Sequence, residues 1–255
     1  MLEQKIPTYN LAVKDKIETY TKTLFYALFQ GEEMQRESIK QAKYLFFEIL
    51  EDCSIPCEKH IWESFQQQIP TIRTWLDLDA KAALDIDPAA KSLREVYLAY
   101  PGFHAIAIYR LSRELWVLNV PIVPRMMSEY AHSVTGTDIH PGASIGKAFF
   151  IDHATGIVIG ETAVIKDHVK IYQGVTLGGI QIKKELGTVK RHPTIEDHVT
   201  IYANATILGG DIVIGAHAII GANVWITQSI EPHALVTYKS AVQIKTQHES
   251  TTNHT

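Results

Sequence analysis

Hydrophobic residues follow two different spacings along this chain. In the first half, apolar side chains recur three and four positions apart, the spacing that places them on one face of a helix. Three such sets lie in residues 24–29, 44–50 and 61–69. We expect the third helix to end at Pro70, since proline lacks a backbone donor, and another to run from Pro101 to about Leu118. Residues 1–124 are therefore predicted to form a helical domain that serves oligomerisation.

From about Pro124 onward, aliphatic residues recur at every sixth position instead. The four series are Ile139, Ile145, Ile151 and Ile157; Ile159, Ile165, Ile171 and Leu177; Ile195, Ile201, Ile207 and Val213; and Ile214, Ile220 and Ile226. A helix repeats at 3.6 residues and a half-buried strand at two, and the two-residue alternation of a β-sandwich is weak here. Six residues suit one face of a triangular coil of about 18 residues, the hexapeptide-repeat solenoid. We predict an α+β chain with a left-handed parallel β-helix over residues 125–240, the catalytic domain, and a polar tail over 241–255.

One gap interrupts the six-residue series. The segment between Leu177 and Ile195 carries two adjacent glycines and four cationic side chains. It has about the length of one coil but lacks the aliphatic spacing, so we predict a loop extruded from the β-helix. Loops on rigid scaffolds often carry function.

Composition narrows the classes of partner. The 255 residues are 46% hydrophobic, and 24 basic residues face 28 acidic ones, giving a net charge of −4. This balance predicts no nucleic acid and no anionic membrane as partner, and no apolar run is long enough to span a bilayer. The N-terminus lacks the apolar core of a secretion signal, and only Cys53 and Cys57 are present, so we expect a reduced, cytoplasmic protein. These cysteines and His60 lack a fourth ligand for zinc.

His153 is the first candidate for chemistry. It stands two positions after the inward-facing Ile151, close to where a coil turns its corner. Asp138 comes fifteen residues earlier, in the preceding coil, so the two side chains are expected about one strand spacing, ~5 Å, apart. A carboxylate that orients an imidazole leaves its other nitrogen as a general base.

Histidines are frequent in the second half, which keeps a metal site open as an alternative. They are His132, His140, His153, His168, His192, His198, His217 and His233. Trimeric left-handed β-helices of the γ-carbonic anhydrase kind hold zinc between three histidines at a subunit interface. Outward coil positions also simply tolerate histidine, and no metal is expected in our preferred interpretation.

Several motifs resemble those of serine O-acetyltransferases. Residues 138–146 read Asp-Ile-His-Pro-Gly-Ala-Ser-Ile-Gly, and residues 151–164 read Ile-Asp-His-Ala-Thr-Gly-Ile-Val-Ile-Gly-Glu-Thr-Ala-Val. Further matches lie at residues 87–89, 100–110, 175–179, 190–195 and 205–210. The resemblance covers about residues 85–235. It implies transfer of the acetyl group of acetyl-CoA to the hydroxyl of L-serine, giving O-acetyl-L-serine and CoA, the first step of cysteine biosynthesis from serine.

The resemblance also assigns roles to individual residues. It implies that His153 is the general base and Asp138 its orienting partner. Asp87 and Asp152 match carboxylates that hold the serine ammonium. Arg191 matches the residue that holds the serine carboxylate, with His192 beside it. A zwitterion needs an anion and a cation in its site, and arginine suits a planar carboxylate.

Acetyl-CoA is expected along a groove between two β-helices. Candidate small residues lining that groove are Gly178, Gly179, Ala203, Gly221 and Ala222. The resemblance implies a homotrimer or a dimer of trimers with an active site at each subunit interface. The alternatives are a hexapeptide acetyltransferase with a sugar or amine acceptor, a zinc enzyme of the γ-carbonic anhydrase kind, or a non-catalytic trimeric scaffold.

The C-terminus departs from the family pattern. After the last coil the chain continues with Val-Thr-Tyr-Lys-Ser-Ala-Val-Gln-Ile from Val236 and ends at Thr255, where relatives that dock onto cysteine synthase carry isoleucine. We therefore expect no docking onto cysteine synthase through this terminus.

Overall fold

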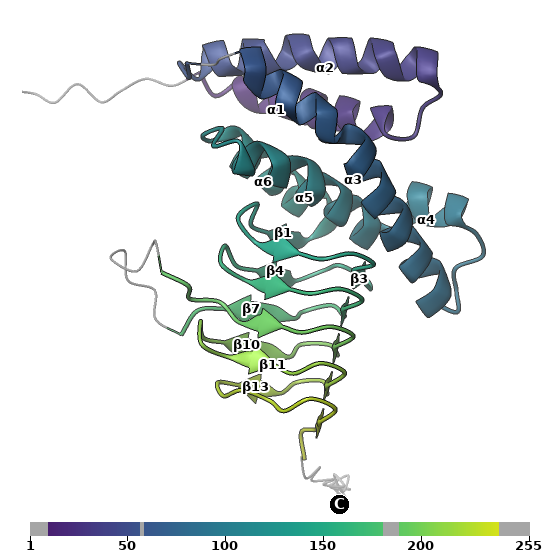
Figure 1. The fold of residues 1–255 in the computed structure, drawn as a ribbon, viewed down its shortest axis with the longest axis vertical. Coiled ribbons are helices and arrows are strands. Elements are labelled where there is room, and N and C mark those ends of the chain that lie inside the picture. The colour runs from purple at the N-terminus through teal and green to yellow at the C-terminus, as the bar shows by residue number, and fades with distance from the viewer. Residues whose placement is uncertain (1–9, 57–58, 181–188, 240–255) are drawn as a thin grey trace, which may run out of the picture.

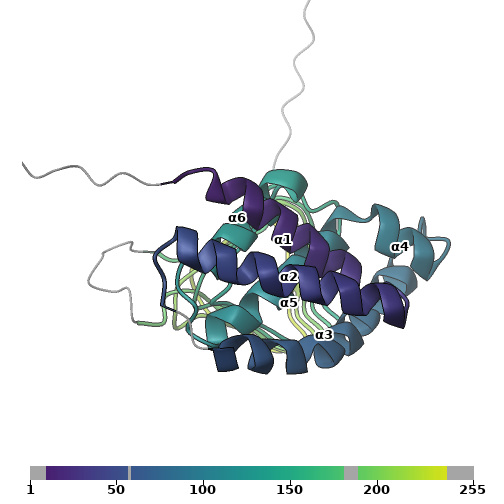
Figure 2. The ribbon, with the colours of Figure 1, turned by 90° about the horizontal axis from the view of Figure 1, so that it is seen from above.

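The computed structural model describes residues 10–56, 59–180 and 189–239. Helices gather at one end of the molecule, and a column of stacked coils forms the other (Figure 1). The helices are α1 (Val13–Ala27), α2 (Glu32–Asp52), α3 (Lys59–Ile86), α4 (Leu93–Ala99), α5 (Pro101–Val117) and α6 (Val123–Thr135). Seen from above, α1, α2 and α3 lie across the end of the column (Figure 2). No helix in these described ranges combines the length and apolarity needed to cross a membrane.

Aromatic side chains hold the first three helices together. The Phe46 ring of α2 lies 6.0 Å from that of Tyr20 in α1 and 5.5 Å from that of Trp62 in α3. All three side chains are fully buried. Rings at these spacings contribute about 0.5–1.5 kcal/mol per pair beyond their burial, so this cluster unites the three helices.

Pro70 does not end a helix, contrary to the prediction. α3 continues through it to Ile86, and the buried face continues from Ile69 through Ile72 to Leu76. Pro70 lies on the exposed side of α3, and so does Gln66, whose carbonyl loses its helical donor. Water can satisfy that carbonyl, which is why the proline is tolerated at this position.

The helical region also ends later in the chain than the boundary expected between residues 124 and 125. That boundary falls inside α6, where Pro124 occupies the first turn. Proline suits this position because the first helical N–H groups have no partner within the helix. α6 ends at Gly136, whose left-handed φ of 73° closes the helix, and the first strand begins at Thr137. The helical region therefore continues to Thr135.

Short parallel strands form the three faces of the column. The first face contains β1 (Thr137–Ile139), β4 (Ile157–Ile159), β7 (Thr176–Gly178), β10 (Thr206–Leu208) and β13 (Trp225–Ile226). The second contains β2 (Ser144–Ile145), β5 (Val164–Ile165), β8 (Thr194–Ile195) and β11 (Val213–Ile214). The third contains β3 (Phe150–Ile151), β6 (Lys170–Ile171), β9 (Thr200–Ile201), β12 (Ile219–Ile220) and β14 (Leu235–Val236). The predicted helical region followed by a parallel β-helix is confirmed.

The six-residue series forms the core of this β-helix. On the first face, register places Ile139, Ile159, Leu177, Ile207 and Ile226 directly above one another. None of these side chains is more than 4% exposed. Burial of one such side chain stabilises the fold by roughly 1.5–3 kcal/mol, so the column is held by its aliphatic interior.

Coil length varies along the β-helix, and it decides which residues of neighbouring coils lie side by side. Asp138 pairs with Val158, twenty positions on, and Val158 pairs with Thr176 after eighteen. Thr176 pairs with Thr206 after thirty, because the predicted loop is inserted between β7 and β8. Residues 181–188 of that loop lie outside the described residues.

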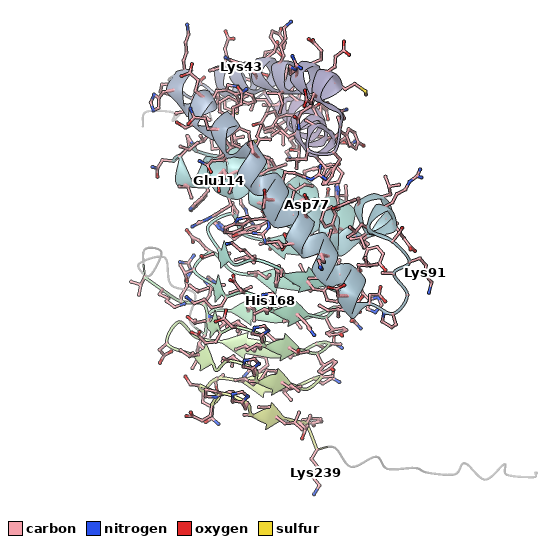
Figure 3. The ribbon with its side chains drawn as sticks, turned by 45° about the vertical axis from the view of Figure 1, so that its right-hand side comes forward. Lys43, Asp77, Lys91, Glu114, His168 and Lys239 are labelled. Carbon is pink, nitrogen blue, oxygen red and sulfur yellow. The ribbon has the colours of Figure 1, made fainter. Side chains whose placement is uncertain are left out.

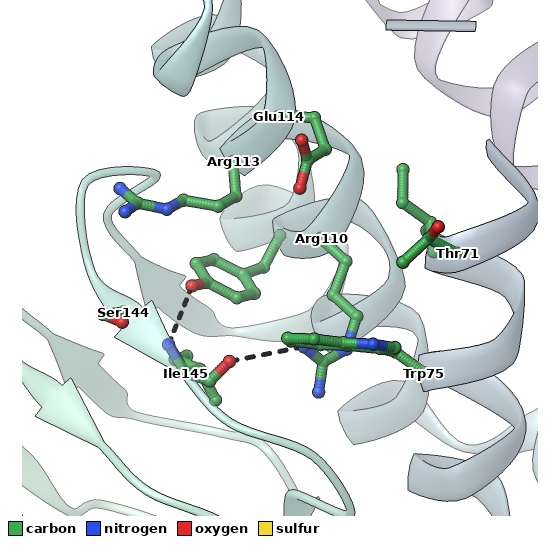
Figure 4. A pocket seen from close by; sticks show the side chains of 9 residues that line it. Thr71, Trp75, Arg110, Arg113, Glu114, Ser144 and Ile145 are labelled. Carbon is green, nitrogen blue, oxygen red and sulfur yellow. Dashed lines mark hydrogen bonds between the residues drawn. The ribbon is translucent and has the colours of Figure 1, made fainter. Parts of the chain in front are cut away.

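A buried ion pair joins the helices to the first coil. Arg110 of α5 donates from Nε to Asp79 Oδ2 of α3 at 2.6 Å and from Nη2 to the Gly146 carbonyl at 2.7 Å. Asp79 also accepts the Phe149 N–H at 2.9 Å. Burial raises the pKa of Asp79, and the guanidinium opposes that shift. The Trp75 ring covers the Arg110 guanidinium (Figure 4), so α3, α5 and the β-helix are fixed relative to one another.

Candidate active site

His153 occupies the corner between β3 and β4. Its backbone has a φ of 58°, and that of Ala154 is 67°, so two consecutive residues adopt the left-handed conformation. Ile151 and Ala154 are buried on either side, while the His153 side chain is 66% exposed. The corner therefore projects the imidazole to the surface, as the sequence predicted.

Two carboxylates lie near this imidazole. Asp152 Oδ2 is 3.6 Å from His153 Nε2. Asp87, in the loop between α3 and α4, interacts electrostatically with His153. Its Oδ2 accepts a hydrogen bond from the Tyr100 hydroxyl at 2.5 Å. We refer to Asp87, Tyr100, Asp152 and His153 as the acidic cluster.

The acidic cluster keeps Asp87 ionised. The hydrogen bond from Tyr100 lowers the pKa of Asp87 most strongly, followed by that from the Ala89 N–H to Oδ1 at 2.8 Å. The same hydrogen bond raises the pKa of Tyr100 to about 12, so its hydroxyl stays protonated and donates. The cluster therefore presents a fixed anion beside an exposed imidazole.

A second group of polar residues surrounds the outward side of the first face. Asp138, Glu161, Arg191 and His192 line a pocket of about 400 Å³. Arg191 forms an ion pair with Glu161, and Asp138 lies 3.9 Å from Arg125. We refer to Asp138, Glu161, Arg191 and His192 as the arginine cluster.

His192 is the buried member of the arginine cluster. Its side chain is only 9% exposed, and this burial, with help from Arg191, lowers the pKa of the imidazole to about 4. The Thr162 N–H donates to Nδ1 at 3.0 Å, which leaves Nε2 as the protonated nitrogen of a neutral ring. A Cβ on Gly160 would lie 2.1 Å from Nε2, so only glycine leaves room for the ring.

Asp138 and His153 are not neighbours within one chain, contrary to the expected spacing of one strand. Register places Val158 beside Asp138, five positions beyond His153. The reason is the long corner at residues 152–156, which makes the first coil two residues longer than the second. The predicted pairing of these two side chains thus does not arise inside the chain.

The two clusters lie at opposite edges of the first face. His153 precedes β4, whereas Glu161 follows β4 and Arg191 follows β7 along the chain. Asp87 and Asp152 are brought to His153, and Asp138 is brought to Arg191 and His192. Within a single chain, the predicted site residues therefore form two separate groups.

The candidate CoA-binding residues divide in the same way. Ala203 and Ala222 stack on one another at the corner that carries His153 in the first coil, with Asn223 N–H donating to the Ala203 carbonyl at 3.0 Å. Gly221 begins that corner in its coil. Gly178 and Gly179 lie at the other edge, where a Cβ on Gly179 would be 3.2 Å from the Arg191 carbonyl.

Four of the other histidines form a stack. His168, His198, His217 and His233 occupy equivalent corners, with ring centroids 4.7, 4.8 and 4.9 Å apart (Figure 3 labels His168). Within the described ranges, no group of three or more histidine, cysteine or acidic side chains is placed to hold a metal ion. Cys53 is partly buried, which raises the pKa of its thiol, and Cys57 lies outside the described residues.

Similarity to solved structures extends over almost the whole chain. The crystal structure of serine acetyltransferase isoform 3 in complex with cysteine from Entamoeba histolytica is 36% identical and has a TM-score of 0.77, covering 96% of this chain and 88% of that one. This chain belongs to the serine acetyltransferase family. The family fold is the left-handed β-helix, so the predicted handedness is also confirmed. No protein-family model matches the chain.

Curated serine acetyltransferases match about half of this chain. The plasmid-encoded serine acetyltransferase of Synechococcus elongatus is 49% identical over 136 residues, which are 51% of this chain and 43% of that protein. The Helicobacter pylori enzyme is 48% identical over 119 residues, 47% of this chain and 67% of that protein. The match thus spans less than half the length of the first of these relatives.

Sequence reasoning missed three members of the site. Glu161 and Thr162 lie within the motif at residues 151–164, but their roles depend on the return of residues 191–192 to that coil. Tyr100 precedes the helix-starting Pro101, and its bond to Asp87 joins segments thirteen positions apart. Only the fold brings these groups together.

Proposed function

We propose that this chain transfers the acetyl group of acetyl-CoA to the hydroxyl of L-serine, giving O-acetyl-L-serine and CoA. The observation that carries the proposal is the exposed imidazole of His153 beside the carboxylates of Asp87 and Asp152, at the position that matches the family's motif. It also fits a relative solved with serine, the enzyme of Neisseria gonorrhoeae, at 29% identity and a TM-score of 0.66.

The proposed reaction transfers one proton, from the serine hydroxyl to His153 and then to the CoA thiolate. His153 accepts the serine hydroxyl proton as the oxygen attacks the thioester carbonyl carbon. The C–S bond then breaks, and the imidazolium returns the proton to the departing CoA thiolate. Backbone N–H groups near the corner would stabilise the oxyanion that forms in between.

Substrate charge matches the two clusters. The serine ammonium fits against Asp87 and Asp152, and the serine carboxylate fits against Arg191, which would exchange Glu161 for this partner. His192, neutral and holding its proton on Nε2, can donate a hydrogen bond in the same pocket. Arginine binds a planar carboxylate through two parallel hydrogen bonds.

Two chains are needed to complete such a site. The clusters lie on opposite edges of one face, so a threefold arrangement that packs unlike edges together unites the acidic cluster of one chain with the arginine cluster of the next. Asp138 would then orient His153 from the neighbouring subunit. A homotrimer, or a dimer of trimers paired through the helices, provides this contact.

The same interface offers a groove for acetyl-CoA. Ala203, Gly221 and Ala222 continue the His153 corner along the β-helix, and Gly178 and Gly179 lie at the edge that would face them from the next chain. Serine acetyltransferase from Brucella abortus, 30% identical with a TM-score of 0.67, has been solved in complex with coenzyme A.

A thiol-release assay tests the proposal. Purified chain and acetyl-CoA are incubated with serine, homoserine, or a panel of sugars and amines, and free CoA is measured. Serine-dependent release with a formed O-acetylserine product is the expected result. Release only with a sugar or amine would favour another hexapeptide acetyltransferase, and no release with millimolar serine would overturn the proposal.

A further inference from the structure

Tyr100 connects the acidic cluster to the body of the molecule. It is the residue before α5, in extended conformation, and its hydroxyl donates to Asp87 Oδ2 at 2.5 Å. The sequence motif at residues 100–110 gave no role to this side chain. Its position between two elements that approach His153 suggests that it does more than fill space.

The start of α5 is fixed against the first coil. A Cβ on Gly102 would lie 2.2 Å from the Ile151 carbonyl, so the helix and the strand are in closest contact at this point. Phe103 is buried directly after it. Tyr100 therefore lies two residues before the glycine that contacts Ile151. From Ile151 the chain continues directly into Asp152 and His153.

The Asp87 carboxylate is held from outside its own loop by the Tyr100 hydroxyl. Its loop between α3 and α4 is largely exposed at Pro88 and Ala89. The Ala89 N–H bonds Oδ1 within the loop, at 2.8 Å, and so orients the carboxylate only relative to that loop. The Tyr100 hydroxyl bonds Oδ2 from outside the loop. Oδ1 of Asp87 is thus bonded within the loop, whereas Oδ2 is bonded by Tyr100 from outside it.

We propose that Tyr100 is a positioning residue: its hydroxyl holds the Asp87 carboxylate at a fixed place relative to Asp152 and His153, and thereby determines the affinity for the acceptor's amino group. This inference rests on the proposed function. The inference extends that function by separating acceptor binding from proton transfer, because the Tyr100 hydroxyl bonds Asp87 and not the imidazole of His153.

Removal of this one hydroxyl tests the role. In Tyr100→Phe, the KM for serine should rise about tenfold, since a hydrogen bond to a charged group is lost. The kcat and the KM for acetyl-CoA should stay within about twofold of the unmodified chain, because His153 and the CoA groove are untouched.

The pH profile gives a second readout that a purely structural role would not move. Charged or titratable groups that interact with Asp87 or Tyr100 are His153, Asp152, Lys91, Tyr172 and Glu95. The Tyr100 hydroxyl is the largest cause of the lowered pKa of Asp87, so its loss raises that pKa. The titration of the Asp87 carboxyl, followed by ¹³C NMR, should therefore move to higher pH in Tyr100→Phe.

Tyr44→Phe is the matched control. Tyr44 lies on the exposed side of α2, away from both clusters, and its hydroxyl donates to Glu48 Oε1 at 2.9 Å. This variant loses the same kind of bond and should leave both KM values and the Asp87 titration unchanged. The thermal unfolding midpoint of each variant shows that it is folded.

Two outcomes separate this role from the proposed function. A folded Tyr100→Phe variant with an unchanged KM for serine and an unmoved Asp87 titration overturns the role of Tyr100 while the acetyltransferase activity stands. A fall in kcat together with an equal rise in the KM for acetyl-CoA would also overturn the role of Tyr100. An unmodified chain without serine-dependent thiol release overturns the proposed function itself.

Discussion

At the scale of single residues, exposure decides which imidazole can exchange a proton. His153 is mostly exposed and has a carboxylate 3.6 Å away, whereas burial lowers the pKa of His192 to about 4. Between pH 5 and 8 His192 therefore stays neutral and is a weak base, which supports His153 as the base of the proposed reaction. The two histidines have the same side chain in different surroundings, which is why we propose different roles for them.

Loss of the base is expected to abolish most of the activity. His153→Ala should lower kcat by roughly 10²–10⁴-fold, the range for a missing general base. Asp138→Ala should cost less, because it only orients the ring. Thiol-release kinetics at saturating serine and acetyl-CoA measure both variants. Near-normal turnover of His153→Ala would show that the proton goes elsewhere.

Gly160 is expected to be essential for the arginine cluster. In Gly160→Ala the new methyl group would overlap the His192 ring, so the ring must leave its place on Thr162. We expect kcat/KM for serine to fall by about tenfold or more, since a small misplacement in a site is costly. Gly31→Ala is the control, because its Cβ would meet nothing within 4 Å. Equal activity of the two variants would contradict the role of His192.

At the scale of elements, the corners of the β-helix depend on left-handed residues. His168, His198, His217 and His233 all have φ values of 60–62°, and corners elsewhere use Asn204 and Asn223 in the same conformation. Asparagine and histidine are among the few non-glycine residues that adopt it readily. The histidine stack is thus explained by corner geometry alone.

The free energy of unfolding should therefore depend on how readily the residue at each corner adopts a positive φ. His198→Asn is expected to change the free energy of unfolding little, whereas His198→Val should destabilise the fold by about 1–3 kcal/mol, because a β-branched residue is strained at positive φ. Chemical denaturation with both variants measures the difference. If Val and Asn at this position were equally stable, stacking of the rings rather than φ would control the corner.

At the scale of the whole molecule, the proposed active site requires an assembly of chains. The helices are fixed on the β-helix by the buried pair of Arg110 and Asp79, which also sets where Asp87 and Tyr100 approach the first coil. The arginine cluster lies at the far edge of the same face. In the proposed trimer, each chain would therefore contribute one half of two different sites.

Mixed oligomers test this arrangement. His153→Ala and Arg191→Ala chains should each be nearly inactive, yet refolding them together at equal amounts should restore about a quarter of the wild-type activity, since that share of interfaces combines two intact clusters. Thiol release by the mixture measures the recovery.

The control mixes His153→Ala with Asp152→Ala. Both changes lie in the acidic cluster, so no interface in that mixture has an intact one, and activity should stay low. Failure of the first mixture to recover activity, while mixed oligomers are detected by mass, would show that the site lies within one chain.

The sequence by itself determined the repeating part of this protein. A six-residue period is enough to predict the β-helix, because each face buries its own aliphatic residue and needs no information from distant segments. It also placed His153 on a corner and the insertion between Leu177 and Ile195. Local prolines misled it at Pro70 and Pro124, since a proline inside a helix and one at its start look alike without knowing which side is exposed.

Tertiary structure alone decided which charged groups meet. The length of one corner sets the register that separates Asp138 from His153, and no local pattern reports that length. The bond between Tyr100 and Asp87 requires α5 to dock on the first coil, and the bond between Thr162 and His192 requires the inserted loop to return to it. Contacts between distant segments depend on packing, which a one-dimensional period cannot encode.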